Sequence, residues 1–141
     1  MTSGEDPPRT SHVLELDDGV PDISEVRQWT RTALSRLHED DALDVLLIVT
    51  ELVSNVYDHG RFPARLCLHE RTEPRAVRIE VEDASSKPPV LQPTSAGAQR
   101  GRGLIIVDQL AQGWGVAQHT VGKTVWALIS CVSTPAYEAR L

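Results

Sequence analysis

The sequence predicts a two-layer α/β (α+β) sandwich, in which three main helices cover one face of a mixed, mainly antiparallel sheet of about five strands. The stretch 43–56 is apolar on too many sides for a surface helix, which predicts a helix in the centre of the fold. Segment 76–83 instead alternates apolar and charged residues, which is typical of a strand with one covered and one solvent-facing side. A short link containing Pro74 joins it to the preceding strand, 64–70, and this favours an antiparallel hairpin.

The length and charge of the chain exclude several classes of protein. Its 141 residues suit one domain with a proper core, and the net charge of -6 argues against direct nucleic-acid binding. No apolar run reaches the roughly 20 residues that span a membrane, and residues 1–11 lack the apolar segment of a secretory signal. Cys67 and Cys131 fall in expected strands without a metal-ligand or disulfide spacing, which indicates reduced core residues. We therefore expect a cytoplasmic protein that does not associate with membranes.

The remaining elements follow from local patterns. In the first half we expect a disordered N-terminus at 1–11, a short strand at 12–17, a helix at 21–38 with Pro21 in its first turn, and a second helix from about Asp41 to Gly60. The second half holds a long proline-rich loop, which in a compact domain indicates function or disorder. The expected order there is a loop at 84–100, a helix from about 104, a strand from 113, a last strand at 125–131 and a loose tail at 133–141, so that one domain covers 12–132.

Three polar residues lie one turn apart on the central helix. Glu51, Asn55 and His59 are spaced by four, so a helix places them on one face. A carboxylate, an amide and an imidazole on a mostly buried helix are costly to desolvate without partners, which points to a site. Taken alone, the triplet is explained more simply by a solvent-facing polar stripe.

Two further stretches carry chemistry. Gly101-Arg102-Gly103 precedes a helix, where glycines permit close approach of the backbone to an anion and free N–H groups point at it, while Arg100 adds positive charge. A glycine pair also permits a simple tight turn, and neither the Walker nor the dinucleotide pattern is present. Asp83 ends a strand, where its carboxylate could accept a hydrogen bond from a ligand amino group, although a turn-forming aspartate is the simpler alternative.

In this order the pieces resemble the Bergerat-fold, histidine-kinase-like ATPases. The pattern is Glu-x-x-x-Asn on a helix, Asp-x-Ser after a strand, Gly-x-Gly-Leu on a helix and Gly-x-Thr before the last strand. Within that group the chain looks most like the single-domain anti-sigma-factor serine/threonine kinases of bacteria. Glu51-Leu-Val-Ser-Asn55 and Gly101-Arg-Gly-Leu-Ile-Ile-Val107 carry most of the resemblance, which covers about residues 12–132.

The resemblance implies a Mg²⁺·ATP site. Asn55 would coordinate Mg²⁺ through its amide oxygen, and Glu51 would act as general base toward the attacking hydroxyl or water. Asp83 would hold the adenine amino group, with Ser85 beside it and Thr124 supporting it through a hydrogen bond or water.

The same resemblance assigns the phosphates to the third helix. Gly101, Gly103 and Leu104 would wrap them with backbone N–H groups, and Arg100 or Arg102 could stabilise the developing charge.

The partner implied by the resemblance is an anti-anti-sigma-like regulator, phosphorylated on serine or threonine, with a sigma factor as a further partner and a homodimer left open. Ser85 stands where the family pattern commonly has glycine, and Val56 where alanine is common. These departures motivate an alternative, a non-catalytic ATP-binding module that sequesters a transcription regulator, and a domain without nucleotide is a third option. Trp114 and Trp126 are candidate contacts on the open face of the sheet, with a place in the core as their alternative.

Overall fold

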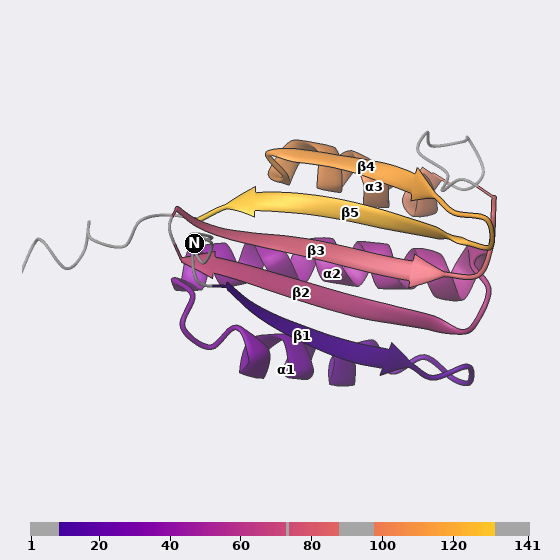
Figure 1. Cartoon of the computed structure of the whole chain (residues 1–141), viewed down its shortest axis with the longest axis horizontal. Coiled ribbons are helices and arrows are strands. Elements are labelled where there is room, and N and C mark those ends of the chain that lie inside the picture. The colour runs from indigo at the N-terminus through magenta and orange to yellow at the C-terminus, as the bar shows by residue number, and fades with distance from the viewer. Residues whose placement is uncertain (1–8, 73, 88–97, 132–141) are drawn as a thin grey trace, which may run out of the picture.

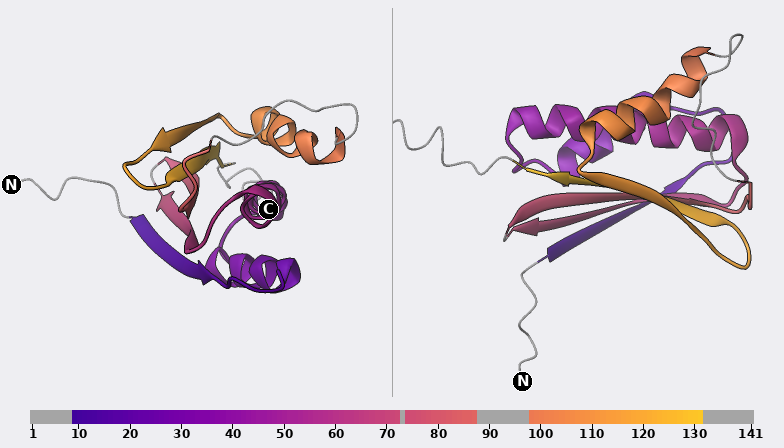
Figure 2. Two further views of the ribbon diagram at one scale, coloured as in Figure 1. Left: turned by 90° about the vertical axis from the view of Figure 1, so that its right-hand side faces the viewer. Right: turned by 90° about the horizontal axis from the view of Figure 1, so that it is seen from above.

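The computed structural model describes residues 9–72, 74–87 and 98–131, and these form two layers. One layer is a five-stranded sheet and the other consists of three helices on one of its faces (Figures 1 and 2). The elements are β1 (Arg9–Leu16), α1 (Ile23–Ala33), α2 (Glu39–His59), β2 (Ala64–Thr72), β3 (Arg75–Asp83), α3 (Ala98–Leu110), β4 (Gly113–Gln118) and β5 (Lys123–Ser130). The predicted sandwich, with its helix and strand counts, is confirmed.

The strand order is β1-β2-β3-β5-β4, so the last strand lies between the third and fourth. Every pair among these strands is antiparallel, and the sheet has no parallel component within the described residues. The β2–β3 pair is the expected hairpin, with Leu66 opposite Val81. Asp83 is opposite Lys123 across the β3–β5 pair, a register that decides the chemistry of the site below.

Helix α2 forms the centre of the helical layer. It contacts α1 on one side and α3 on the other, and it packs on β3 and β5. Its apolar residues meet the inward-facing residues of the strands, and the largest side chains that are almost wholly buried come from both layers. These are Leu46, Ile48, Leu52, Leu66, Leu68, Ile79, Leu104, Val45, Val49, Val53, Val77 and Val81.

The ends of the first two helices differ from the prediction. Asp22 caps α1 by accepting a hydrogen bond from the backbone N–H of Glu25 at 3.1 Å, so Pro21 lies just outside the helix. The helix ends at Ala33 instead of about 38, because the chain tightens into a turn in which the Leu37 N–H donates to the Leu34 carbonyl at 3.1 Å. This turn keeps Leu34 buried without continuing the helix.

Both ends of the long helix α2 carry capping hydrogen bonds. His38 caps α2 through Nδ1, which accepts a hydrogen bond from the backbone N–H of Asp40 at 3.1 Å. The first turn is acidic, which suits the positive end of the helix dipole. Gly60 ends the helix as predicted, and its N–H donates to the Val56 carbonyl at 2.8 Å.

The chain termini bear on the expected domain boundaries. Strand β1 begins at Arg9, so residues 9–11 belong to the sheet and not to the expected disordered segment. Residues 1–8, much of the 84–100 loop and the expected tail at 133–141 lie outside the described residues. Among the helices of the described residues, none combines the length and apolar character that crossing a membrane requires.

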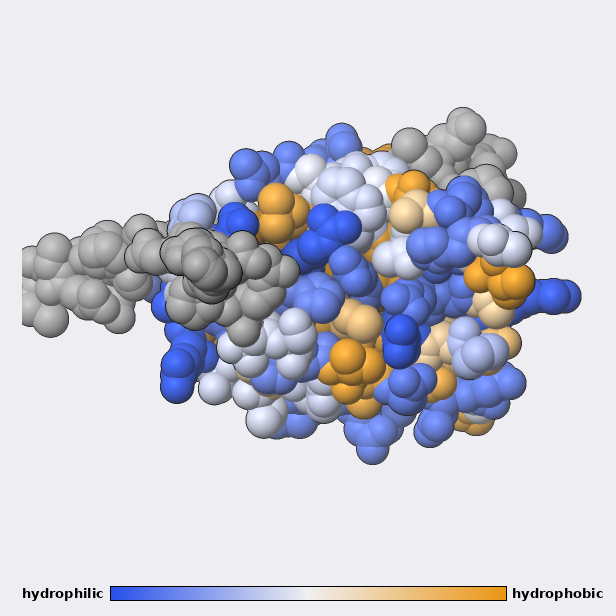
Figure 3. Space-filling view, viewed as in Figure 1, coloured by the Kyte–Doolittle hydropathy of each residue, from blue (hydrophilic) through white to orange (hydrophobic). Residues whose placement is uncertain are grey.

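The sheet face without helices is mainly hydrophilic, with separate apolar patches (Figure 3). Trp126 lies on it, and the Arg78 guanidinium stacks 4.4 Å from the centroid of the Trp126 ring. Trp114 does not share this face. It is opposite Ala127, packs against the core, and its Nε1 donates to Asp108 of α3 at 2.9 Å. Trp114 is therefore wrong as a candidate contact on the open face, because the alternation of β4 turns its side chain toward the helices.

Candidate functional site

A cavity of about 330 Å³ lies where the C-terminal half of α2 meets the adjoining ends of β3 and β5. Its volume falls within the range of about 300–1,000 Å³ that is usual for small-ligand sites. Its walls combine aliphatic side chains with four charged groups, one imidazole and one amide. The lining residues are Leu52, Asn55, Val56, Asp58, His59, Gly60, Val81, Asp83, Lys87, Lys123 and Val125.

Asp83 lines this cavity, although its side chain is only 3% exposed. Its Oδ1 accepts a short hydrogen bond of 2.6 Å from the backbone N–H of Ser85 and a longer one of 3.5 Å from that of Arg61. Gly60 allows this close packing, since a Cβ at Gly60 would lie 3.1 Å from the Asp83 Cγ. The carboxylate is thereby held in one orientation by backbone donors.

Lys123 completes the surroundings of Asp83, although it was not among the predicted site residues. Its Nζ donates to Asp83 Oδ2 at 3.0 Å and Oδ1 at 3.3 Å, and it contacts the Ser85 carbonyl at 3.4 Å. The Lys123 side chain is 6% exposed, so this is a buried ion pair whose two charges compensate one another. The signal was available: Lys123 is two residues before Val125, and alternation places both on the helix-covered face.

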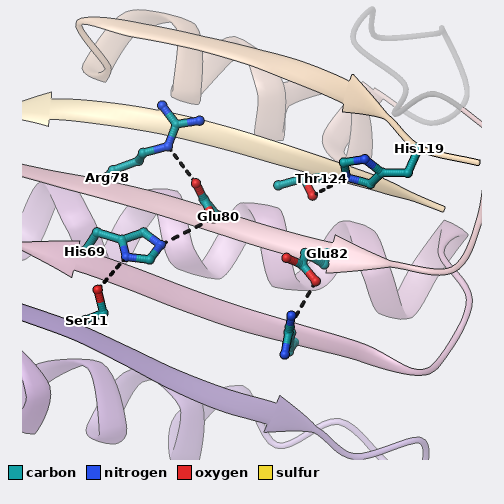
Figure 4. A network of polar contacts seen from close by, with 8 residues as sticks. Ser11, His69, Arg78, Glu80, Glu82, His119 and Thr124 are labelled. Carbon is teal, nitrogen blue, oxygen red and sulfur yellow. Dashed lines mark hydrogen bonds and ion pairs between the residues drawn. The ribbon is translucent and has the colours of Figure 1, made fainter. Parts of the chain in front are cut away.

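Thr124 is not brought to this cavity, which corrects the expectation that it supports Asp83. It points to the opposite face of the sheet, where Thr124 Oγ1 and His119 Nε2 share a hydrogen bond of 2.8 Å (Figure 4). Strand alternation is the reason, because consecutive residues of a strand face opposite sides. Lys123 therefore lies beside Asp83, in the position that was predicted for Thr124.

Ser85 shapes the turn that follows β3. It is 5% exposed, its N–H donates to Asp83, and its Oγ accepts a hydrogen bond from the Lys87 N–H at 3.1 Å. Its side chain thus holds the backbone of the turn at Lys87, and Ser85 does not itself line the cavity.

The two predicted residues of α2 are placed differently. Asn55 lines the cavity, together with Asp58 and His59 from the following turn. Glu51 is half-buried one turn earlier on the helix and is not among the lining residues. The structure therefore joins Asn55 to Asp83 in one hollow, and leaves Glu51 beside it.

The predicted phosphate-binding stretch belongs to α3. This helix begins at Ala98, so Gly101 and Gly103 lie within its first two turns instead of preceding it, and Arg100 and Arg102 lie there too. The side chains of 98–103 are outside the described residues. Leu104 is fully buried in the core and does not line the cavity.

A second hollow, of about 450 Å³, lies on the open face of the sheet. Three of its polar side chains form a network: Glu80 accepts from Arg78 Nε at 2.7 Å and contacts His69 Nε2 at 3.3 Å, while His69 Nδ1 pairs with Ser11 at 2.8 Å (Figure 4). We therefore assign this network to the stability of the sheet surface.

Cys67, Glu80 and Glu82 approach one another on that face, with their potential ligand atoms within 4.8 Å. Arg78 already neutralises Glu80, and Arg65 Nε donates to Glu82 at 2.9 Å, so the carboxylates have cationic partners. Burial raises the pKa of the Cys67 thiol, and Glu82 contributes to the rise, which disfavours the thiolate that a metal would need.

A family model and two solved structures are similar to this chain. A family model for the histidine kinase-like ATPase domain matches residues 20–129. The RsbU and RsbW domains of Rv1364c from Mycobacterium tuberculosis superpose with a TM-score of 0.63 at 16% identity, over 86% of this chain and 32% of that chain. The histidine kinase domain from the Erythrobacter litoralis EL346 blue-light activated histidine kinase gives a TM-score of 0.49 at 17% identity, over 77% of this chain and 59% of that chain. Both spans are under two thirds of the solved chains, and at these identities the first likeness shows the fold alone. A comparison with curated proteins finds no match.

Proposed function

Because the chain belongs to the histidine kinase-like ATPase domain family, we propose that it binds Mg²⁺·ATP in the cavity between α2, β3 and β5. We further propose that it is a serine/threonine protein kinase of the anti-sigma-factor type. The observation that carries the proposal is the meeting of Asn55 and Asp83, from two separate elements, in one partly apolar hollow. An adenine base suits such a hollow, because aliphatic walls contact its faces while a fixed carboxylate meets its amino group.

The oxygen donors in the cavity suit Mg²⁺. Asn55 offers an amide oxygen and Asp58 a carboxylate, and both line the same end of α2. Mg²⁺ prefers such hard oxygen ligands and takes the rest of its shell from water and phosphate. We assign Asn55 as the protein ligand, with the metal supplying charge neutralisation to the phosphates when bound.

The phosphates would then extend toward the N-terminal turns of α3. The N–H groups at the start of a helix are free to donate to an anion, and the glycines allow close approach. Gly101, the fourth residue of α3, is the proposed backbone donor. The expectation that Gly103 and Leu104 also donate is corrected, because they lie beyond the first four residues of the helix, where backbone N–H groups donate to intrahelical carbonyls. Arg100 and Arg102 are the proposed cationic groups.

Glu51 is the proposed general base. Its carboxylate would take the proton of a serine or threonine hydroxyl on the partner as that oxygen forms its bond to the γ-phosphorus and the bond to the leaving ADP breaks. The substrate we propose is an anti-anti-sigma-like protein, and a sigma factor would be a second partner.

One observation favours a second function, a non-catalytic ATP-binding module that sequesters a transcription regulator. Glu51 does not line the cavity, whereas Val56, a larger residue than the alanine common in the family, does. In that case ATP would bind without turnover.

Calorimetric titration of Mg²⁺ and ATP tests the site directly. We expect the intact protein to bind and Asn55→Ala to bind at least about tenfold more weakly, since it loses a charge-assisted contact. Leu47→Ala is the matched control, because Leu47 is exposed on α2 away from the cavity. Equal affinity of Asn55→Ala and the control would contradict the site.

Phosphate transfer separates the two functions. The protein is incubated with labelled ATP and candidate anti-anti-sigma-like proteins, alongside Glu51→Gln. Transfer that disappears in Glu51→Gln while ATP still binds supports the kinase. ATP binding without transfer to any cognate partner supports the sequestering module.

A further inference from the structure

Lys123 occupies an unusual position for a lysine, because it lines the cavity and is buried against Asp83. Resting on the proposed ATP site, we infer that Lys123 is a second base-recognition group, which donates a hydrogen bond to N1 of adenine while Asp83 accepts one from the adjacent amino group. The amino group and N1 of adenine, a donor beside an acceptor, would thus meet the Asp83 carboxylate and the Lys123 ammonium group, an acceptor beside a donor.

The hydrogen-bond inventory of Asp83 favours adenine over guanine. Oδ1 already accepts from the Ser85 N–H at 2.6 Å and is approached by the Arg61 N–H at 3.5 Å, whereas Oδ2 has only Lys123 as a partner among the described residues. A carboxylate oxygen has room for about two hydrogen bonds. One free acceptor position matches the single amino group of adenine, while the edge of guanine presents two neighbouring N–H donors.

The ammonium group of Lys123 has one donor that a ligand could engage. An ammonium group carries three N–H donors. Its acceptors among the described residues are Asp83 Oδ2 at 3.0 Å, Asp83 Oδ1 at 3.3 Å and the Ser85 carbonyl at 3.4 Å. The contact with Ser85 is the longest of the three, so an acceptor on a ligand in the cavity would replace it, and Lys123 lines that cavity.

The aliphatic walls strengthen this arrangement. Leu52, Val56, Val81 and Val125 surround the pair and are each almost fully buried. Hydrogen bonds from charged groups are stronger where water is excluded, and a buried polar group without a partner costs more free energy there. A base lacking the N1 acceptor would present a C–H to this donor and leave it with the long contact to the Ser85 carbonyl, so that base should bind more weakly than adenine.

The test compares three nucleotides on the intact chain by calorimetry with Mg²⁺. ATP carries both groups, 1-deaza-ATP lacks the N1 acceptor, and purine riboside triphosphate lacks the amino group. We expect 1-deaza-ATP to bind about tenfold or more weakly than ATP to the unmodified protein, as for loss of a hydrogen bond to a charged group. Purine riboside triphosphate should also bind more weakly, through Asp83.

Two variants assign the discrimination to Lys123. Lys123→Met should bind ATP and 1-deaza-ATP about equally, while Lys87→Met, which removes the same charge from an exposed position on the cavity wall, should keep the ratio of the unmodified protein. Circular dichroism checks that both variants fold. The comparison of nucleotides on the unmodified protein stands even if Lys123→Met does not fold.

The outcomes separate this inference from the proposed function. Equal binding of ATP and 1-deaza-ATP to the unmodified protein overturns the inference and leaves the ATP site intact. Tighter ATP binding by Lys123→Met also overturns it, because Lys123 would then compete with the base for Asp83. A preference for GTP overturns the adenine assignment. No binding of any nucleotide overturns the proposed function and the inference together.

Discussion

Replacing Asp83 by asparagine should destabilise the protein strongly, because it leaves the Lys123 ammonium buried without a counter-charge. The two side chains are 3% and 6% exposed and lie 3.0 Å apart. Removing one partner of such a pair costs about 3–5 kcal/mol of the free energy of unfolding. Asparagine keeps the shape and can still accept from the Ser85 N–H. The loss is therefore electrostatic and not a loss of packing.

That magnitude is a large part of the total stability, which is about 5–15 kcal/mol for a native domain. Urea unfolding followed by circular dichroism at pH 7 measures it, provided that the slope of free energy against urea stays constant. Glu82→Gln is the matched control, on the next residue of the same strand. Its ion pair with Arg65 has side chains 35% and 46% exposed and should contribute only about 0–1 kcal/mol.

The double variant Asp83→Asn/Lys123→Met sharpens the test. If the cost arises from an unpaired buried charge, removing the lysine as well should restore much of the stability lost in Asp83→Asn. Losses for Asp83→Asn and Glu82→Gln that agree within about 0.5 kcal/mol, the usual scatter of surface substitutions, would refute the reasoning. A double variant that is less stable than Asp83→Asn would refute it equally.

Three further substitutions probe other features of the fold. Gly60→Ala should lower the free energy of unfolding by about 1–3 kcal/mol in urea titrations, because its Cβ would lie 2.9 Å from a carbonyl oxygen and 3.1 Å from Asp83 Cγ. Gly122→Ala should lower the free energy of unfolding by about 2 kcal/mol or more in a thermal melt, because φ is 91° and the new Cβ would overlap the Asp83 carbonyl. Gly19→Ala is the control, and it should change little because the space around Gly19 is open. Burial, with a smaller contribution from Asp41, raises the pKa of Cys131 from 9.0 to about 12. Between these values the unfolded chain loses a proton that the folded one keeps, so stability should fall as pH rises above about 9, and Cys131→Ser should show less of this decline between pH 8 and 10.

The sequence was sufficient to predict the layers of the fold because their patterns are local. The alternation of 76–83 and the apolar breadth of 43–56 each predicted an element that the structure contains. The family match over residues 20–129 confirms the resemblance that the ordered motifs predicted. Boundaries were less predictable, because the turn after Ala33 and the pairing of residues 9–11 depend on tertiary contacts that local patterns do not encode.

The site was only partly predictable. Asn55 and Asp83 do share a cavity, but Thr124 faces the opposite side of the sheet, which the family pattern does not encode. The register of β5 against β3 decides this, and it turns Lys123 inward. Trp114 shows the same effect. Alternate residues of β4 face opposite sides of the sheet, and local patterns do not indicate which of them face the helices.

The position of β5 within the sheet also has a consequence for synthesis on the ribosome. Strand β5 lies between β3 and β4 but is the last of the five to leave the ribosome. Until it docks, β3 has an unpaired edge and the Asp83 carboxylate lacks the lysine that neutralises it. A nascent chain stalled before Lys123 should therefore expose a strand edge that is open to mispairing.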